Sequence, residues 1–135
     1  MLYNYYYLAI QNWCSVENQI HGLWPDLTPA SYPSFCDGPQ FNLTELQESP
    51  QYNTLAKVWT DCSYDETISL YEHEWSKHGT CVFVETGIGQ NEYFETALKL
   101  FEHSPDGGCF DLQFKPFDCS TRGLAPVNPL SIRIE

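Results

Sequence analysis

Cysteine is the residue that most constrains how this chain can fold. The 135 residues contain six cysteines, an even number, and no two of them form a CxxC pair. In so short a chain this pattern favours disulfide bonds, formed in an oxidising compartment, over a zinc site or a redox motif. Residue spacing alone leaves the pairing open. We therefore expect a disulfide-bonded protein that is secreted, lysosomal or vacuolar.

The length suits one domain spanning residues 1–135, and a composition that is 42% hydrophobic and 16% aromatic can fill its core. We expect no signal peptide, because the segment 1–10 has neither a basic start nor a small-residue cleavage site. No apolar run approaches the roughly 20 residues of a membrane helix, so no membrane contact is expected. Asn42-Leu43-Thr44 is a glycosylation sequon, which fits a secretory route.

The net charge of −12 argues against a protein whose main task is to hold nucleic acid. Such binding draws its affinity from Lys and Arg that neutralise phosphates. An enzyme needs only a local positive pocket, and protonated carboxylates and histidines would reduce the general repulsion of RNA at acidic pH.

The hydrophobic pattern predicts both strands and helices. Residues 3–10 are aromatic and β-branched enough for a buried strand, and frequent Pro, Ser, Asp and Gly predict a loop from Leu27 to Gln40. Three helices are predicted: a short one capped by Asn42, a second over 50–59 and a third over 92–103. Residues 109–119 predict a strand and turn, with Phe110, Leu112 and Phe114 alternating. The apolar faces of the second and third helices comprise Tyr52, Leu55, Ala56 and Trp59, and Tyr93, Phe94, Ala97, Leu98 and Phe101.

The segment His73-Glu74-Trp75-Ser76-Lys77-His78-Gly79-Thr80-Cys81 has the strongest chemical signal. We predict a short helix here over 72–77, ended by Gly79. One helical turn would then gather two histidines, a glutamate and a lysine. An acid, a base and a cation are what phosphodiester cleavage requires.

Two other interpretations of this segment stay open. The histidines stand five residues apart, whereas the zinc-protease helix needs four, so a metallohydrolase using His73, Glu74 and His78 is disfavoured. Alternatively, Glu74 and Lys77 form a solvated ion pair between surface histidines.

The segment Ile20-His21-Gly22-Leu23-Trp24-Pro25 makes the second alternative less attractive. Gly22 permits close backbone approach beside His21, and Trp24 can stack on a base. Two such segments in one oxidised domain favour a catalytic site.

Together, the two segments resemble the active-site signatures of the ribonuclease T2 family of acid endoribonucleases. The resemblance extends to Tyr7-Leu8-Ala9, to Tyr93-Phe94 with Ala97-Leu98, and to the segment around Cys109 and Cys119. It implies an α+β fold, with an antiparallel sheet packed by helices. It also implies cleavage of single-stranded RNA through a 2′,3′-cyclic phosphate, without a metal or another cofactor.

The resemblance further implies a role for each site residue. His78 would be the general base and His21 the general acid, while Glu74 and Lys77 stabilise the charged intermediate and His73 holds phosphate. The base 5′ to the cut would be bound by three residues, namely Trp24, Asp26 and Tyr32.

The resemblance implies the disulfides Cys36–Cys81 and Cys109–Cys119, which leaves Cys14 with Cys62. Relative to the family, the stretch between Ile10 and His21 is short, and tens of residues are missing between Phe101 and Cys109. Leu70 and Tyr71 stand where the family tends to have larger aromatics. We therefore expect a T2-like fold shortened toward its C-terminus, acting as a monomer. The competing hypothesis is a catalytically idle T2-like binding or effector module.

Overall fold

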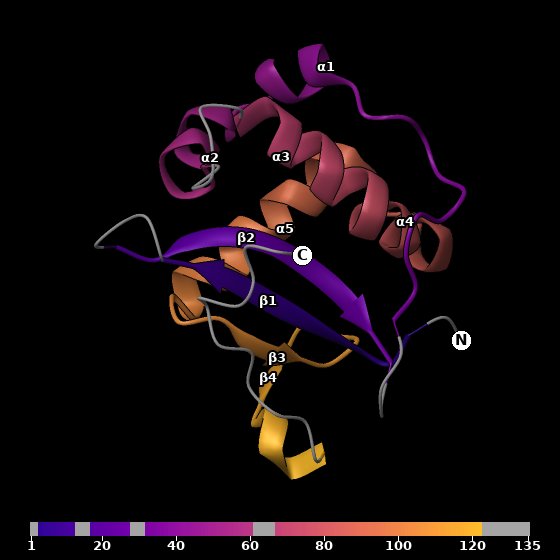
Figure 1. Cartoon of the computed structure of the whole chain (residues 1–135), viewed down its shortest axis with the longest axis vertical. Helices are drawn as coiled ribbons and strands as arrows, with labels where there is room; N and C mark the ends of the chain where they lie inside the picture. The colour runs from indigo at the N-terminus through magenta and orange to yellow at the C-terminus, as the bar shows by residue number, and fades with distance from the viewer. Residues whose placement is uncertain (1–2, 13–16, 28–31, 61–66, 123–135) are drawn as a thin grey trace.

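The computed structural model describes residues 3–12, 17–27, 32–60 and 67–122. Helices and strands are both present, and the strands form one four-stranded antiparallel sheet in the order β2-β1-β3-β4. Helices α1 to α4 lie above this sheet in Figure 1, while α5 packs against β1 and β2. The predicted α+β fold is confirmed. The elements are β1 (Tyr5–Gln11), β2 (Gln19–Asp26), α1 (Leu43–Gln47), α2 (Tyr52–Val58), α3 (Thr67–Glu74), η1 (Trp75–Gly79), α4 (Thr80–Thr86), α5 (Gln90–His103), β3 (Gly108–Phe110), β4 (Pro116–Phe117) and η2 (Cys119–Arg122).

Strand β1 is buried on both faces, which explains its continuous run of aromatic and β-branched residues. Side chains on one face, such as Leu8, enter the main core with the apolar stripe of α5. Those on the other face, such as Tyr7, form a second cluster with Trp24 and Cys109. The predicted strand and the predicted helix over 92–103 are thus both confirmed.

The two short helices match their predictions with one exception. The Asn42 side chain accepts a hydrogen bond of 3.0 Å from the Glu45 N–H and so caps α1. On α2, Leu55 is buried and Trp59 follows the helix into the core, but Ala56 is exposed, so its assignment to the apolar face was wrong. The reason is that α2 ends at Val58 and contacts the core along a narrower stripe than the pattern indicated.

The segment after α5 was predicted only in part. Strand β3 stops at Phe110, and the chain then turns into β4. Leu112 and Phe114 therefore lie in the turn and do not extend the strand. Phe114 has a φ of 62° and stacks on Tyr6 with 4.5 Å between ring centroids, a long-range contact that the alternating pattern could not reveal. The disulfide Cys109–Cys119 closes this turn, as expected.

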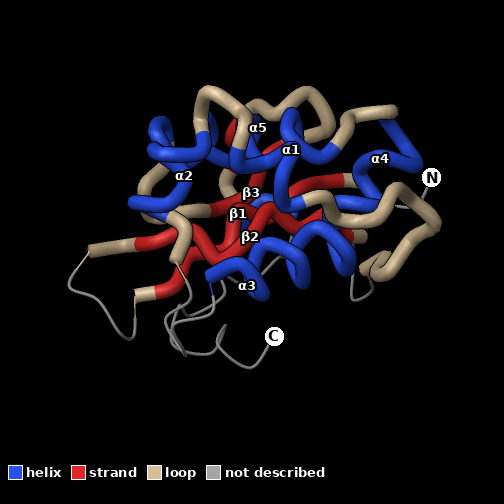
Figure 2. The backbone as a smooth tube through the Cα atoms, turned by 90° about the horizontal axis from the view of Figure 1, so that it is seen from above, coloured by secondary structure: helices blue, strands red, loops and turns tan. Residues whose placement is uncertain are grey.

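Strand β2 is the edge strand next to α3, and the two elements run side by side in Figures 1 and 2. Segment η1, which continues α3, also contacts β2. The two sequence segments with the chemical signal are therefore neighbours in space. Within the described residues, no helix is long and apolar enough to cross a membrane.

Candidate active site

The site is organised around the carboxylate of Glu74, the last residue of α3, which is fully buried. The Trp24 indole N–H donates a 2.7 Å hydrogen bond to Oε1, and His21 Nδ1 lies 3.5 Å from Oε2. His78 Nε2 is 3.9 Å from Oε1, and His73 Nε2 is 3.9 Å from Oε2. One buried carboxylate thus faces three imidazoles and an indole, drawn from both predicted segments.

His21 reaches this position through a β-bulge. The β1–β2 register passes from Ala9 opposite Gly22 to Ile10 opposite Ile20, so His21 is the extra residue in β2. A bulge locally increases the twist of a strand and redirects a side chain. His21 is consequently buried beside Glu74.

Gly22 is required by the close approach of Glu74 to β2. A Cβ atom at this position would overlap the Glu74 carboxylate and would lie 2.5 Å from the Trp24 indole nitrogen. The space that a side chain would occupy is therefore taken by the carboxylate itself. Gly22 was predicted to permit a close approach to the backbone, and the group that approaches is the Glu74 carboxylate.

The second segment is not one short helix that ends at Gly79, so that prediction was wrong. The chain forms the π-helical turn η1 and continues into α4, with Gly79 at a helical φ of −64°. Helix α4 ends instead at Gly87, whose φ is 80°. Gly79 is needed because a Cβ there would collide with the Trp75 ring. Single π-turns within helices occur frequently at functional sites.

His78 occupies an apolar pocket, with only 1% of its surface exposed. The Trp24 ring stacks on it at 5.0 Å between centroids, and Tyr32 lies 6.4 Å away. Neither ring nitrogen has a hydrogen-bond partner among the described residues. Burial lowers the pKa of His78 to about 4, although the Glu74 carboxylate acts in the opposite direction.

The pKa of Glu74 is shifted downward. Burial raises it, but the neighbouring His21 and His78 and the Trp24 N–H more than compensate, so the pKa lies below its usual value. Glu74 therefore stays ionised at mildly acidic pH, and the site keeps its central negative charge.

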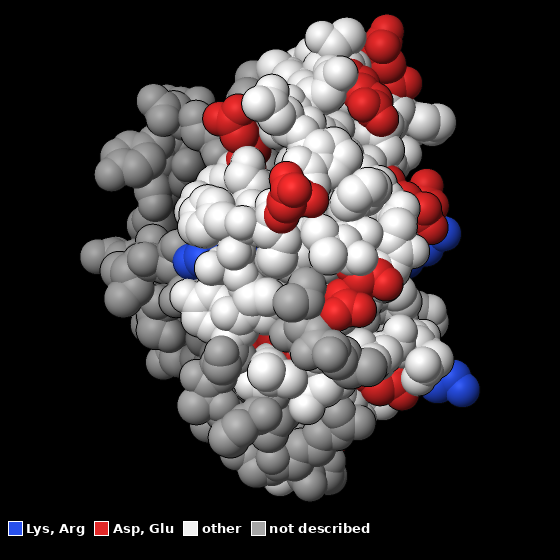
Figure 3. Space-filling view, turned by 90° about the vertical axis from the view of Figure 1, so that its right-hand side faces the viewer, with Lys and Arg blue, Asp and Glu red and all other residues white. Residues whose placement is uncertain are grey.

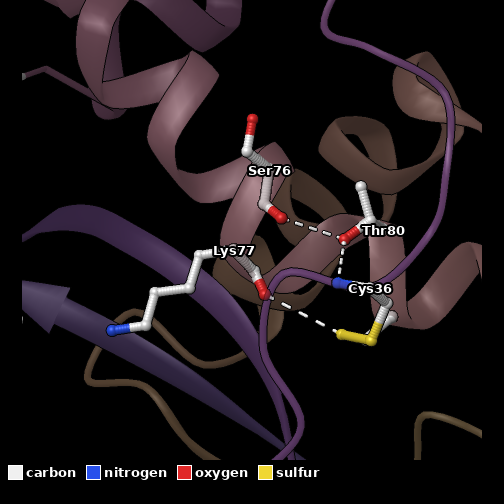
Figure 4. The surroundings of a disulfide bond; sticks show 5 residues. Cys36, Ser76, Lys77 and Thr80 are labelled. Carbon is white, nitrogen blue, oxygen red and sulfur yellow. Dashed lines mark hydrogen bonds between the residues drawn. A yellow bond between two sulfur atoms is a disulfide. The ribbon is translucent and has the colours of Figure 1, made fainter.

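Three further residues surround this centre. The His73 side chain is 42% exposed, so it forms the solvent side of the site. Lys77 Nζ lies 5.5 Å from the centroid of the Tyr32 ring, which is 47% exposed. Figure 4 shows the Lys77 side chain directed away from the disulfide. Asp26 ends β2, where it accepts a 2.8 Å hydrogen bond from the Leu27 N–H.

A disulfide fastens the loop of residues 32–41 to this helical segment. Cys36 pairs with Cys81, as expected, and the Cys36 N–H donates a 3.1 Å hydrogen bond to Thr80 Oγ1 (Figure 4). The Thr80 hydroxyl in turn donates to the Ser76 carbonyl at 2.9 Å. The sequence alone did not predict that Thr80 would accept a hydrogen bond from the Cys36 N–H, or that the neighbouring Phe35 N–H would donate one to the Lys77 carbonyl. The expected pair Cys14 and Cys62 lies outside the described residues.

The predicted acidic surface is visible in Figure 3, where Asp and Glu are spread over one face and basic residues lie only at its margins. In the described part of the chain, no group of three or more His, Cys, Asp and Glu residues is arranged to hold a metal ion. Three histidines, His21, His73 and His78, face Glu74, and Lys77 is close enough to His78 to oppose its protonation.

Fold and site together define a disulfide-bonded α+β protein with a histidine-based site. A model of the ribonuclease T2 family matches residues 5–110, so the chain belongs to that family. Ribonuclease DdI of Dictyostelium discoideum is 36% identical over 110 residues, which cover 71% of this chain and 48% of that protein. Ribonuclease 1 of Arabidopsis thaliana is 36% identical over 109 residues, or 70% and 46% of the two chains. The chain spans about half the length of these curated relatives.

Solved structures confirm the fold. Ribonuclease MC1 from bitter gourd seeds superimposes with a TM-score of 0.65 at 24% identity, covering 75% of this chain and 58% of that one. An RNase-related protein from Calystegia sepium gives a TM-score of 0.71 at 22% identity, covering 96% and 95%.

Proposed function

We propose that this protein is an endoribonuclease that cleaves single-stranded RNA by internal phosphoryl transfer. The 2′-oxygen attacks the adjacent phosphorus while the bond from phosphorus to the 5′-oxygen breaks. The products are a 2′,3′-cyclic phosphate and a free 5′-hydroxyl, and water then opens the ring to a 3′-phosphate. The observation that carries this proposal is the buried Glu74 carboxylate flanked by His21 and His78.

Under this proposal the two histidines have opposite roles in proton transfer. Burial keeps His78 neutral at mildly acidic pH, so it can accept the proton of the 2′-hydroxyl. His21 presents Nδ1 to the Glu74 carboxylate, an arrangement that orients the ring so that its other nitrogen can serve as the general acid for the leaving oxygen. Lys77 would stabilise the negative charge that develops at phosphorus, and exposed His73 would hold phosphate. The buried Glu74 carboxylate would contribute through His21, which it faces.

The cover over His78 implies that substrate entry requires side-chain movement. Trp24 and Tyr32 both lie against His78, and each is proposed to contact the base 5′ to the cut. Tyr32 is the more exposed of the two and lies on a loop, so we infer that its ring moves aside and stacks on the base. Asp26 would accept a hydrogen bond from an exocyclic amine. Ribonuclease MC1 variants have been crystallised in complex with 5′-GMP and 5′-UMP, which supports a nucleotide-binding site in this fold.

The test is an RNA digestion by the purified, oxidised protein in the presence of EDTA over a range of pH. We expect metal-independent cleavage that is fastest at mildly acidic pH. His21→Ala and His78→Ala should each lower kcat by about a hundredfold to ten thousandfold, because each removes one proton transfer.

His103→Ala is the matched control, since His103 is exposed at the end of α5. Cleavage abolished by EDTA, or full activity in the His78→Ala variant, would contradict the proposal.

A second candidate function is suggested by the short connection between α5, which ends at His103, and β3, which begins at Gly108, where the family has tens of residues more. In this alternative, the protein is an idle binding or effector module that retains the pocket. A folded, oxidised protein that binds oligonucleotide but shows no cleavage at any pH would establish it.

We also propose an oxidising location, secreted, lysosomal or vacuolar, which the two described disulfides support. Asn42 and Thr44 are both exposed at the start of α1, so the sequon is accessible to glycosylation. A mass shift on the expressed protein that is lost in Asn42→Gln and removed by a glycosidase would support the modification.

A further inference from the structure

Phe35 is the most exposed of the large hydrophobic residues in the described structure, with 63% of its surface accessible. Its ring lies edge-on to His73, with 6.4 Å between ring centroids. Trp24 and Tyr32, in contrast, lie against His78. The site therefore has two separate aromatic groups, one beside each histidine of the helical segment.

The backbone holds Phe35 in a conformation that a bulky residue rarely adopts. Its φ is 49°, in the left-handed region that favours Gly and Asn. The Phe35 N–H donates a 2.9 Å hydrogen bond to the Lys77 carbonyl, and the next residue, Cys36, is held by its disulfide to Cys81 and by Thr80. An exposed aromatic in strained backbone adds nothing to the core, so stability does not account for it.

We propose that Phe35 is a stacking platform for a third RNA base, beyond the two nucleotides that flank the cut. This inference rests on the proposed function. A phenyl face has no hydrogen-bonding groups, so it would stack on any base without regard to sequence. His73, exposed beside it, is placed to contact the phosphate that leads to that nucleotide.

The surroundings favour RNA over a protein partner. Phe35 stands beside the protonatable side chain of His73, and the Lys77 ammonium lies 5.5 Å from the ring of Tyr32 on the same loop, in a chain whose net charge is −12. These groups attract phosphate, and the acidic remainder of the surface leaves few other places for it. A single exposed ring on a short loop is also far smaller than a stable protein interface.

The experiment compares chimeric oligonucleotides that contain one ribose among deoxyriboses, so that only one bond can be cut. The shortest is a dinucleotide, and two trinucleotides extend it by one residue on the 5′ or the 3′ side. We expect the wild type to show a higher kcat/KM for one of the trinucleotides. In Phe35→Ala the ratio of that kcat/KM to the dinucleotide value should fall by about fivefold to a hundredfold, chiefly through KM.

Three variants make the result specific. Phe35→Tyr should keep the ratio, Phe35→Leu should lose most of it, and Val84→Ala, which trims another exposed apolar residue on α4, should leave it unchanged. An equal loss on dinucleotide and trinucleotide would overturn the inference in favour of a structural role for Phe35. No change on any substrate would overturn it too, and would leave a protein contact as the reason for the exposed ring.

The outcome can be separated from that of the proposed function. If the wild-type protein cleaves none of the chimeras, the proposed function fails. Binding of an all-deoxy trinucleotide then tests the platform, because stacking needs no 2′-hydroxyl. Weaker binding by Phe35→Ala than by wild type and Val84→Ala supports the inference, and equal binding overturns it.

Discussion

The two histidines proposed for catalysis sit on two different kinds of irregular backbone. His21 is the extra residue of a β-bulge, and His78 lies in a π-helical turn. Each is followed by a glycine, but the glycines make room for different groups. Gly22 accommodates the Glu74 carboxylate, which belongs to the site, whereas Gly79 accommodates the Trp75 ring, which belongs to the core. On the strand side, the glycine at position 22 therefore serves the chemistry of the site. On the helix side, the glycine at position 79 serves the packing of the core.

Of the variants that test this comparison between the two glycines, Gly22→Ala is expected to have the largest effect. The new methyl group must displace the Glu74 carboxylate, and a misplacement of about 1 Å can cost roughly a hundredfold in rate. We expect a loss of activity of at least this size, together with a lower free energy of unfolding. Gly89→Ala is the matched control, because a Cβ there meets nothing within 4 Å. A fully active Gly22→Ala protein would show that the site tolerates movement of Glu74.

Gly79→Ala tests the other half of the comparison between the two glycines. Its methyl group meets the buried Trp75 ring, so we expect a cost of about 1–3 kcal/mol in unfolding free energy, as overpacked cores show. The folded fraction should retain more activity than Gly22→Ala does. Urea unfolding combined with the rate per folded molecule measures both quantities. Equal activity losses in the two variants would remove the distinction between the strand side and the helix side.

The buried state of His78 should make stability depend on pH. Its pKa is about 4 in the folded protein against 6.5 when unperturbed, so between these values the unfolded chain binds a proton that the folded chain does not. The free energy of unfolding should therefore fall as the pH is lowered from 6.5 to about 4, by on the order of 3 kcal/mol for this group.

The measurement is urea unfolding at several pH values for wild type, His78→Gln and His103→Gln. Other groups titrate in the same range, so the informative quantity is the difference in slope between proteins. His78→Gln should flatten the dependence, and the exposed control should not. Identical slopes in all three would mean that His78 is protonated normally in the folded state.

The smallest effect is expected on the loop that carries Tyr32 and Phe35. Thr80→Val removes the hydroxyl that accepts the Cys36 N–H and leaves the disulfide intact. We expect a loss of about 1 kcal/mol in unfolding free energy, with Thr80→Ser close to wild type. Amide hydrogen exchange at residues 35 and 36 should be faster in the valine variant. Unchanged exchange would show that the disulfide alone holds the loop.

The sequence predicted well the elements whose buried side chains form a regular pattern. Strand β1 and helix α5 have strong periodic patterns that local propensity and core packing both support. The resemblance to a known family supplied both disulfides found among the described residues, a pairing that spacing could not have chosen. Residue types and spacing had already singled out most of the site residues, and the resemblance added their roles. Of these residues, the structure brings together His21, His73, Glu74, His78 and Trp24.

The irregular features were not predictable from local pattern. Helical spacing treated residues 72–77 as an ordinary helix, but η1 is held by distant groups, such as the Pro39 carbonyl that accepts the Trp75 indole N–H at 2.8 Å. Gly79 was taken as a terminator because glycine often ends helices, whereas here it relieves a side-chain contact. The bulge at His21 depends on the register with β1, which no single segment encodes. Phe35 had only a weak signal, an aromatic residue next to a cysteine in a polar loop.

Strand β2 lies at the edge of the sheet, and the neighbouring helices cover it. An edge strand exposes main-chain groups that can pair with another copy of the chain. Here Gln19–Pro25 are buried, β2 contacts α3, η1 and α5, and the Tyr93 hydroxyl donates a 2.7 Å hydrogen bond to the Leu23 carbonyl. Any change that detaches η1 from the sheet would expose an edge strand able to pair with another chain, and it would disrupt the active site at the same time. Inactivation and self-association should then begin together, so light scattering would report the failure of the site as promptly as an RNA assay.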